Sequence, residues 1–275
     1  MGDSFKGTVA IIQFPGVNCE YETASAVRSI GLTAEIFRWN EDPGFLDECS
    51  AIILPGGFSY QDRIRAGVVA AKDRIMDKVS DLARRGRPVL GICNGAQVLV
   101  ESGLIPGIHW EKVDLALAPN IMDDREGYYC NWVHLRKEKS ECFWTTRYLE
   151  GEVIPIPVAH AEGRFVTESA NVLEEMKKNS QIALRYCDAA AAIVESFPVN
   201  PNGSVENIAG VSNRGGNVLA MMPHPERATW LRQVPEDLAG RWAKKRRGAF
   251  GRAEQMEDEG PGRKFFAALR GGNGA

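Results

Sequence analysis

The stretch PVLGICNGAQVLV, residues 88–100, says most about the fold of this chain. An apolar run leads into GICNG at 91–95, and a helix-like segment, 96–100, follows at once. This pattern is typical of a strand that enters a sharp turn, with a thiol at its apex and a helix directly behind it. Glycines are expected on both sides, because such a turn is strained and leaves no room for a Cβ near the nucleophile. The sequence therefore predicts a nucleophile elbow with Cys93 at its apex.

Apolar runs alternate with helical patterns through the first hundred residues. Strands are predicted at 8–14, 34–39, 50–54 and 89–92, and helices at 18–30 and 68–85. Buried strands separated by helices are typical of βαβ units, so we predict an α/β fold with a mostly parallel central sheet flanked by helices. Functional groups of such sheets gather beyond the carboxyl ends of the strands. We therefore expect Phe14-Pro15-Gly16, Pro55-Gly56-Gly57 and Cys93, which all follow strands, to share one edge.

The second half of the chain is richer in predicted strands, at 131–135, 153–158, 182–186, 191–196, 208–212 and 218–222. No linker interrupts them, so we predict a single domain over residues 1–275. Residues from about 229 to 262 change character, with a basic cluster at 244–247. We expect a helical or partly mobile extension there, either solvated or docking a partner.

Charge and composition exclude several classes of protein. The 275 residues include 33 basic and 36 acidic ones, which gives no reason to expect nucleic acid or an anionic membrane as a partner. No apolar stretch approaches the roughly 20 residues of a membrane helix, and residues 1–6 lack a signal-peptide core. The six cysteines form no C-x-x-C pair and are interpreted as reduced thiols. A cytoplasmic protein is the expectation.

A cysteine nucleophile needs a base, and the base needs a group that holds its tautomer. His224 is the best of the four histidines, because prolines on both sides restrict its backbone and Glu226 follows two residues later. We predict Cys93, His224 and Glu226 as nucleophile, base and orienting carboxylate. His160 belongs to a second His-x-Glu pattern, with Glu162, and is a rival base, a residue of the substrate pocket or a core histidine.

Attack on an amide also requires donors for the developing oxyanion. The N–H of Asn94 is one candidate, and the turn at Gly56 and Gly57 offers a second, although such a turn is also common between a strand and a helix. Gln97 and His160 complete the predicted substrate-binding residues. We predict no metal site, since Cys130 and His134 lack a second pair of ligands.

Several motifs together resemble those of class I glutamine amidotransferases. They are GICNG around Cys93, PGGFSY at 55–60 and MPHPER at 222–227. More narrowly, QFPGVNC at 13–19, PVAH at 157–160, NGS at 202–204 and IAGV at 208–211 resemble the glutaminase subunits of phosphoribosylformylglycinamidine synthase. The resemblance runs from about residue 8 to residue 228 and implies a flavodoxin-like fold.

The resemblance also implies a reaction. Cys93 would attack the side-chain amide of L-glutamine and form a γ-glutamyl thioester, and hydrolysis with His224 as acid and base would give glutamate. The ammonia would pass to a large PurL-like synthetase subunit that converts formylglycinamide ribonucleotide to the amidine, usually with a small PurS-like third subunit. No cofactor is expected in this chain, which has no Walker-type loop, and ATP and Mg²⁺ would belong to the synthetase.

Two departures from the family pattern stand out. Gln61 occupies a position where family members commonly have glycine, which leaves the loop beside the oxyanion hole in question. The 229–262 extension exceeds the usual short helical end, and its basic cluster is a candidate contact for the synthetase. The competing interpretation of the elbow is a cysteine hydrolase or stress protein of the related flavodoxin-like superfamily.

Overall fold

The elbow segment lies at the centre of a nine-stranded sheet in the computed structural model, which describes residues 7–109, 112–123 and 125–271. Residues 1–6, on which the expectation of a cytoplasmic protein partly depends, lie outside these ranges. The strand order is β2-β1-β3-β4-β11-β10-β9-β6-β7. The strands are β1 (Thr8–Gln13), β2 (Thr33–Arg38), β3 (Ala51–Leu54), β4 (Val89–Ile92), β6 (Tyr129–Lys137), β7 (Val153–His160), β9 (Ile182–Cys187), β10 (Ile208–Ser212) and β11 (Val218–Met221).

Pairing divides the sheet into two halves. It is parallel across β2, β1, β3, β4 and β11, and antiparallel from β11 through β10, β9 and β6 to β7. The inner strands of the parallel half are buried throughout, as β-branched and aliphatic runs predict for a sheet covered on both faces. The predicted α/β fold is confirmed.

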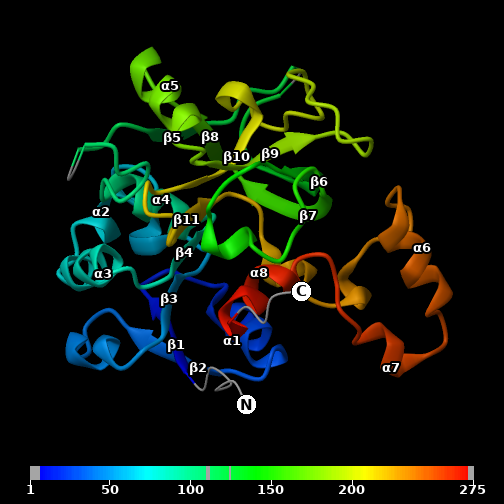
Figure 1. The fold of residues 1–275 in the computed structure, drawn as a ribbon, viewed down its shortest axis with the longest axis horizontal. Helices are drawn as coiled ribbons and strands as arrows, with labels where there is room; N and C mark the ends of the chain where they lie inside the picture. The colour runs from blue at the N-terminus through cyan, green and yellow to red at the C-terminus, as the bar shows by residue number, and fades with distance from the viewer. Residues whose placement is uncertain (1–6, 110–111, 124, 272–275) are drawn as a thin grey trace.

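Helices cover both faces of the parallel half (Figure 1). The helices α1 (Glu20–Ser29) and α8 (Arg263–Ala267) lie on one side of it. The helices α2 (Val68–Ala71), α3 (Ile75–Arg84) and α4 (Asn94–Glu101) lie on the other, with α4 packed against β3, β4 and β11. The helix behind the elbow is therefore fixed by the centre of the sheet.

The prediction of one helix over 68–85 was wrong, because residues 72–74 separate α2 from α3. The carboxylate of Asp73 accepts the backbone N–H of Ile75 at 3.2 Å and the hydroxyl of Tyr60 at 2.7 Å. A side chain that bonds the backbone next to it competes with the helical ladder. Asp73 thus ends one helix and starts the next.

The prediction of a strand over 191–196 was also wrong. Asp188 Oδ1 accepts the N–H groups of Ala190 and Ala192, each at 2.8 Å, and Ala191 has a φ of 68°. Asn207 Nδ2 donates to the carbonyl of Val194 at 2.8 Å. These bonds engage the backbone groups that a strand would use, and β9 already has neighbours on both edges.

Among the elements that were not predicted, three lie next to the site. The strands β5 (Ala116–Pro119) and β8 (Glu162–Val166) form a separate antiparallel pair, and α5 (Ala170–Lys178) follows β8. Ala161 alone joins β8 to β7, so the small pair continues directly from the edge of the main sheet.

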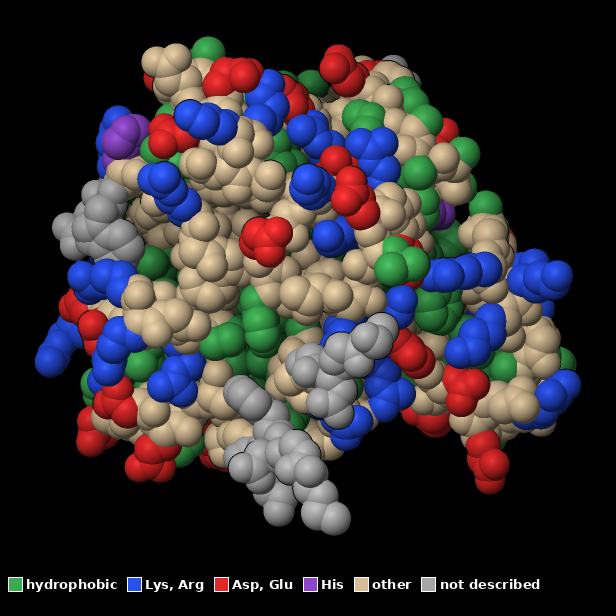
Figure 2. Space-filling view, viewed as in Figure 1, with side chains coloured by type: hydrophobic (Ala, Val, Ile, Leu, Met, Phe, Trp, Pro, Cys, Tyr) green, Lys and Arg blue, Asp and Glu red, His purple; other side chains and the backbone are tan. Residues whose placement is uncertain are grey.

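Residues 230–259, called the excursion below, project from the sheet and carry α6 (Arg241–Gly248) and α7 (Ala253–Met256) (Figure 1). An antiparallel bridge between Trp230 and Glu259 closes its base. Figure 2 shows basic and acidic side chains side by side on this part. Lys245 lies 3.8 Å from Asp258, and Arg246 lies 3.5 Å from Glu236, so part of the basic cluster is paired internally.

Among the described residues, no helix combines the length and the apolar character needed to cross a membrane.

Candidate active site

Cys93 sits at a tight turn between β4 and α4. Its φ of 52° and ψ of −107° are unusual for a residue with a Cβ, and its side chain is buried. A Cβ on Gly95 would lie 1.9 Å from the carbonyl oxygen of Leu54. The second residue of α4 must therefore be glycine for the helix to pack this closely against β3. The Cys93 thiol donates to the carbonyl of Ala159 at 3.7 Å, which brings the end of β7 against the elbow.

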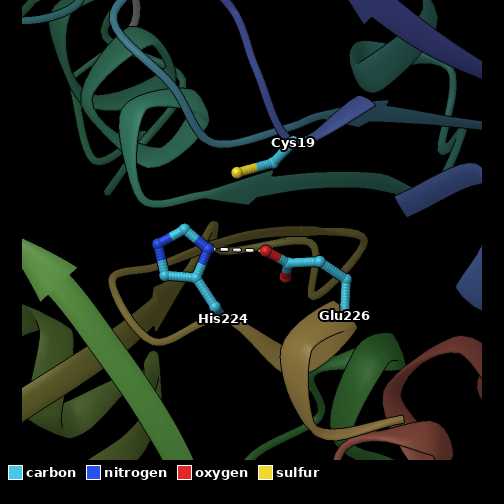
Figure 3. Close-up of side chains that lie close together, drawn as sticks. All are labelled: Cys19, His224 and Glu226. Carbon is cyan, nitrogen blue, oxygen red and sulfur yellow. Dashed lines mark hydrogen bonds and ion pairs between the residues drawn. The ribbon is translucent and has the colours of Figure 1, made fainter. Parts of the chain in front are cut away.

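His224 and Glu226 form a buried pair after β11 (Figure 3). Nδ1 of His224 lies 2.5 Å from Oε1 of Glu226, and the backbone N–H of His224 donates to Pro157 at 2.8 Å. Burial alone would lower the pKa of His224, but the charges of Glu226 and Cys93 and the neighbouring thiols of Cys93 and Cys19 raise it well above its usual value. The structure thus brings the three predicted catalytic residues together, with His224 between carboxylate and thiol.

A second thiol, Cys19, faces the same histidine (Figure 3). The ligand atoms of Cys19, His224 and Glu226 all lie within 4.8 Å of one another. Nη2 of Arg227 donates to Cys19 Sγ at 3.1 Å, and Nε of Arg227 lies 3.7 Å from Glu226. A guanidinium that holds the sulfur and approaches the carboxylate opposes a cation there. These residues therefore do not fit a resident metal, and the absence of a metal stays a prediction.

The weaker metal candidate, Cys130 with His134, lies on β6. Four residues of extended strand advance the backbone by about 13 Å, so the two side chains cannot share an ion.

Gly56 and Gly57 follow β3 and lie beside His224, as the shared-edge prediction requires. A Cβ on Gly56 would lie 2.7 Å from Cε1 of His224, so only glycine permits this approach. The carbonyl of Gly56 accepts the N–H of Cys19 at 3.2 Å. The turn therefore packs the β3 end against both His224 and the start of α1.

The loop after this turn is held by Asn94. Oδ1 of Asn94 accepts the N–H of Ser59 at 2.9 Å, and Nδ2 donates to Asp62 at 3.1 Å. Gln61, the departure from the family glycine, adopts a φ of 60° between Tyr60 and Asp62, which are also left-handed. The loop thus keeps a left-handed backbone at Gln61, at a cost of roughly 1–2 kcal/mol per left-handed residue. Asn94 also begins α4, where its own N–H has no acceptor within the helix.

A cavity opens over the thiol at the junction of these segments. Amide, thiol, aromatic, small and charged residues line it: Asn18, Cys19, Gly57, Phe58, Asp62, Ala66, Cys93, Gln97, Tyr128, Ala159, His160, Ala161, Glu162, His224 and Arg227. Nε2 of Gln97 donates to the carbonyl of Glu162 at 2.6 Å, which joins α4 to β8 across the cavity. Burial and the charge of Glu162 raise the pKa of Asp62 to about 6.

His160 lines the same cavity but has a different partner. Its Nδ1 lies 3.1 Å from Oδ1 of Asn120, and no hydrogen bond joins its ring to Glu162 in the described parts of the chain. Burial and the charge of His224 lower the pKa of His160 to about 3. His160 therefore lacks the carboxylate partner that a rival base would need.

Four residues of this site were missed from the sequence: Cys19, Asp62, Asn120 and Arg227. Cys19 and Arg227 did carry a signal, because each belongs to a segment that was recognised, 13–19 and 222–227. Asp62 directly follows Gln61, the position noted as a departure from the family pattern, but it was not itself predicted as a site residue. Asn120 lies 40 residues before His160, and nothing in the sequence connects the two.

Comparison with known proteins gives consistent matches over most of the chain. A family model described as a CobB/CobQ-like glutamine amidotransferase domain matches residues 6–256. The chain is 46% identical over 269 residues to the phosphoribosylformylglycinamidine synthase subunit PurQ of Methanothrix thermoacetophila, covering 95% of this chain and 96% of the relative. The same subunit of Methanopyrus kandleri is 46% identical over 220 residues, covering 80% and 88%.

A solved structure, that of PurLQS from Thermotoga maritima, matches with a TM-score of 0.70 and 31% identity. The match covers 96% of this chain and 97% of the other.

Proposed function

Because the chain belongs to the CobB/CobQ-like glutamine amidotransferase family, we propose that it is the glutaminase subunit of a phosphoribosylformylglycinamidine synthase. The observation that carries the proposal is the 46% identity to PurQ subunits, almost end to end in the Methanothrix protein. The Cys93–His224–Glu226 arrangement supports it chemically. The alternative, a hydrolase or stress protein of the related superfamily, is not favoured by any of the relatives named above.

In the proposed reaction the sulfur of Cys93 attacks the side-chain carbonyl of L-glutamine. The C–N bond breaks, and His224 gives a proton to the departing nitrogen, so that neutral ammonia leaves. Water then attacks the thioester and gives a proton to His224, the C–S bond breaks, His224 returns the proton to the sulfur of Cys93, and glutamate is released. The high pKa of His224, maintained by Glu226, supports its role as the acid. Backbone N–H groups at Asn94 and at the Gly56-Gly57 turn are the proposed donors to the oxyanion.

The partner in this proposal is a PurL-like synthetase subunit, which consumes the ammonia. The PurLQS neighbour from Thermotoga maritima supports such an assembly. A small PurS-like third subunit, ATP and Mg²⁺ in the synthetase, and a cytoplasmic location complete the proposal.

A two-substrate assay tests this function. The complex of this chain with a PurL-type synthetase should form the amidine from either L-glutamine or free ammonia. Cys93→Ala should abolish the glutamine-dependent rate and leave the ammonia-dependent rate intact, whereas Cys130→Ala, at an exposed thiol, should change neither. An equal loss of both rates, or no loss, contradicts the proposal.

The excursion is proposed as a contact for the synthetase. Because the Trp230–Glu259 bridge closes its base, residues 236–257 can be replaced by a short Gly-Ser linker. Ala249 packs with Leu231 and Val234, so thermal melting should check that the variant is folded. We expect this variant to bind the synthetase at least about tenfold more weakly in a pull-down titration, with Cys93 reactivity unchanged. Unchanged binding rejects the docking role.

A further inference from the structure

The ring of His160 is fixed by one buried amide. Nδ2 of Asn120 donates to the carbonyls of His160 at 2.8 Å and Gly127 at 3.2 Å, while Oδ1 accepts the N–H of Gly163 at 3.2 Å. Carbonyls only accept and an N–H only donates, so these three bonds determine which atom of the amide is oxygen. Oδ1 of Asn120 therefore faces the histidine ring.

This orientation sets the tautomer of His160. Nδ1 lies 3.1 Å from Oδ1 of Asn120, an acceptor, so Nδ1 carries the proton. Nε2 then offers only a lone pair. It is buried and has no hydrogen-bond partner within the described ranges. Buried acceptors are rarely left unpaired, so a donor from a ligand is expected at this atom.

His160 lies in the reacting region. His160 lines the cavity together with Cys93 and His224, and the residue before it, Ala159, accepts the thiol of Cys93 at 3.7 Å. Burial and the charge of His224 keep the pKa of His160 near 3, so Nε2 remains an acceptor at neutral pH.

We propose that Nε2 of His160 accepts a hydrogen bond from the side-chain amide N–H of glutamine and so distinguishes the carboxamide of the substrate from the carboxylate of glutamate. The inference rests on the proposed glutaminase function. A carboxamide presents two N–H donors, whereas an ionised carboxylate presents only acceptors. After hydrolysis, a carboxylate oxygen would face the lone pair, which favours release of the product. No covalent bond to His160 forms.

Ligand binding to a variant that cannot turn over tests the proposal. We expect the full chain with Cys93→Ala to bind L-glutamine at least about tenfold more tightly than L-glutamate by calorimetry, a difference of about 1.4 kcal/mol. Adding His160→Gln should reduce this ratio by about tenfold, because a rotatable amide can donate to a carboxylate. The matched control His109→Gln, exposed and outside the cavity, should leave the ratio unchanged.

The outcomes separate the two proposals. If both ligands still bind to the His160→Gln variant and the ratio stays within twofold, the role of His160 is wrong while the glutaminase function stands. If the Cys93→Ala chain binds no glutamine even with the synthetase present, the proposed function itself fails.

A second measurement needs no substitution at His160. In ¹⁵N-histidine spectra of the Cys93→Ala chain, His160 should carry its proton on Nδ1. Its Nε2 resonance should move when L-glutamine is added and stay in place when L-glutamate is added. A proton on Nε2, or equal shifts with both ligands, overturns the proposal.

Discussion

His160 and His224 occupy segments with the same pattern, a histidine followed two residues later by a glutamate. Both rings are buried, and both line the cavity over Cys93. His224 faces the carboxylate of Glu226, which raises its pKa, whereas His160 faces the amide of Asn120 and has a pKa near 3. One is equipped to move protons, and the other is equipped to accept a hydrogen bond.

The backbone between the two residues accounts for the difference. After His224 the chain enters the 3-10 turn η5 (Pro225–Ala228), which brings Glu226 back to the ring. After His160 it continues from β7 into β8, where two extended residues advance by about 6.6 Å. Local conformation, and not spacing, therefore decides which glutamate reaches its histidine.

Replacing the ring of His224 and the ring of His160 in turn should give the largest difference in rate. We expect His224→Asn to lower glutamine-dependent ammonia release by about 10³-fold, because general acid–base catalysis is lost. His160→Asn keeps a donor for Asn120 and should lower kcat/KM by only about tenfold. Steady-state rates in the synthetase complex measure both, and equal losses would remove the distinction between the two histidines.

Removal of the carboxylate should make His224 more like His160. Glu226→Gln should reduce the rate by about 10²-fold and lower the pKa of His224, since the charge of Glu226 raises it. His224 then loses its proton at a lower pH, so the alkaline limit of glutamine-dependent ammonia release, which needs His224 as the acid, should move toward neutral pH. An unchanged alkaline limit would mean that Glu226 does not control the charge of His224.

The converse change should make His160 more like His224. Asn120→Asp gives this ring a carboxylate partner, which should raise the pKa of His160 and place a proton on Nε2. Glutamate binding to the Cys93→Ala chain should tighten several-fold. The carbonyls of His160 and Gly127 also lose their donor, so the free energy of unfolding should fall by about 1–3 kcal/mol. Calorimetric titration and thermal melting check the two effects, and weaker glutamate binding would contradict the first.

The smallest effect is expected from Glu162, the glutamate of the His160 segment. Glu162→Gln should leave the ¹⁵N shifts of His160 unchanged, because in the described parts of the chain the ring pairs with Asn120 and no hydrogen bond joins it to Glu162. Since the charge of Glu162 raises the pKa of Asp62, this substitution should lower it from about 6, and Asp62 should stay ionised to a lower pH. Carboxyl NMR titration measures the shift. A response of the His160 ring would contradict the assigned partners.

The sequence predicts the features that depend on neighbouring residues and misses those that depend on distant ones. The elbow, the parallel strands and the His224 segment depend on residues close together in the chain, and these predictions describe the structure well. Asn120 joins the site through a contact across 40 residues, which no local pattern encodes. Cys19 lies in the recognised segment 13–19, but its contact with Arg227 spans 208 residues and could not be predicted from that segment. The expected strand at 191–196 was wrong because side chains of Asp188 and Asn207 compete for its backbone.

Reaction of Cys93 with a glutamine-analogue electrophile tests the central claim most directly. When 6-diazo-5-oxo-L-norleucine is added to the chain with its synthetase, peptide mass spectrometry should find one label, on Cys93, which L-glutamine prevents and L-glutamate hardly affects. Cys93→Ala should remove the label, and Cys19 should stay unmodified. An unlabelled Cys93 in the presence of the synthetase would contradict the account of this chain as a glutaminase.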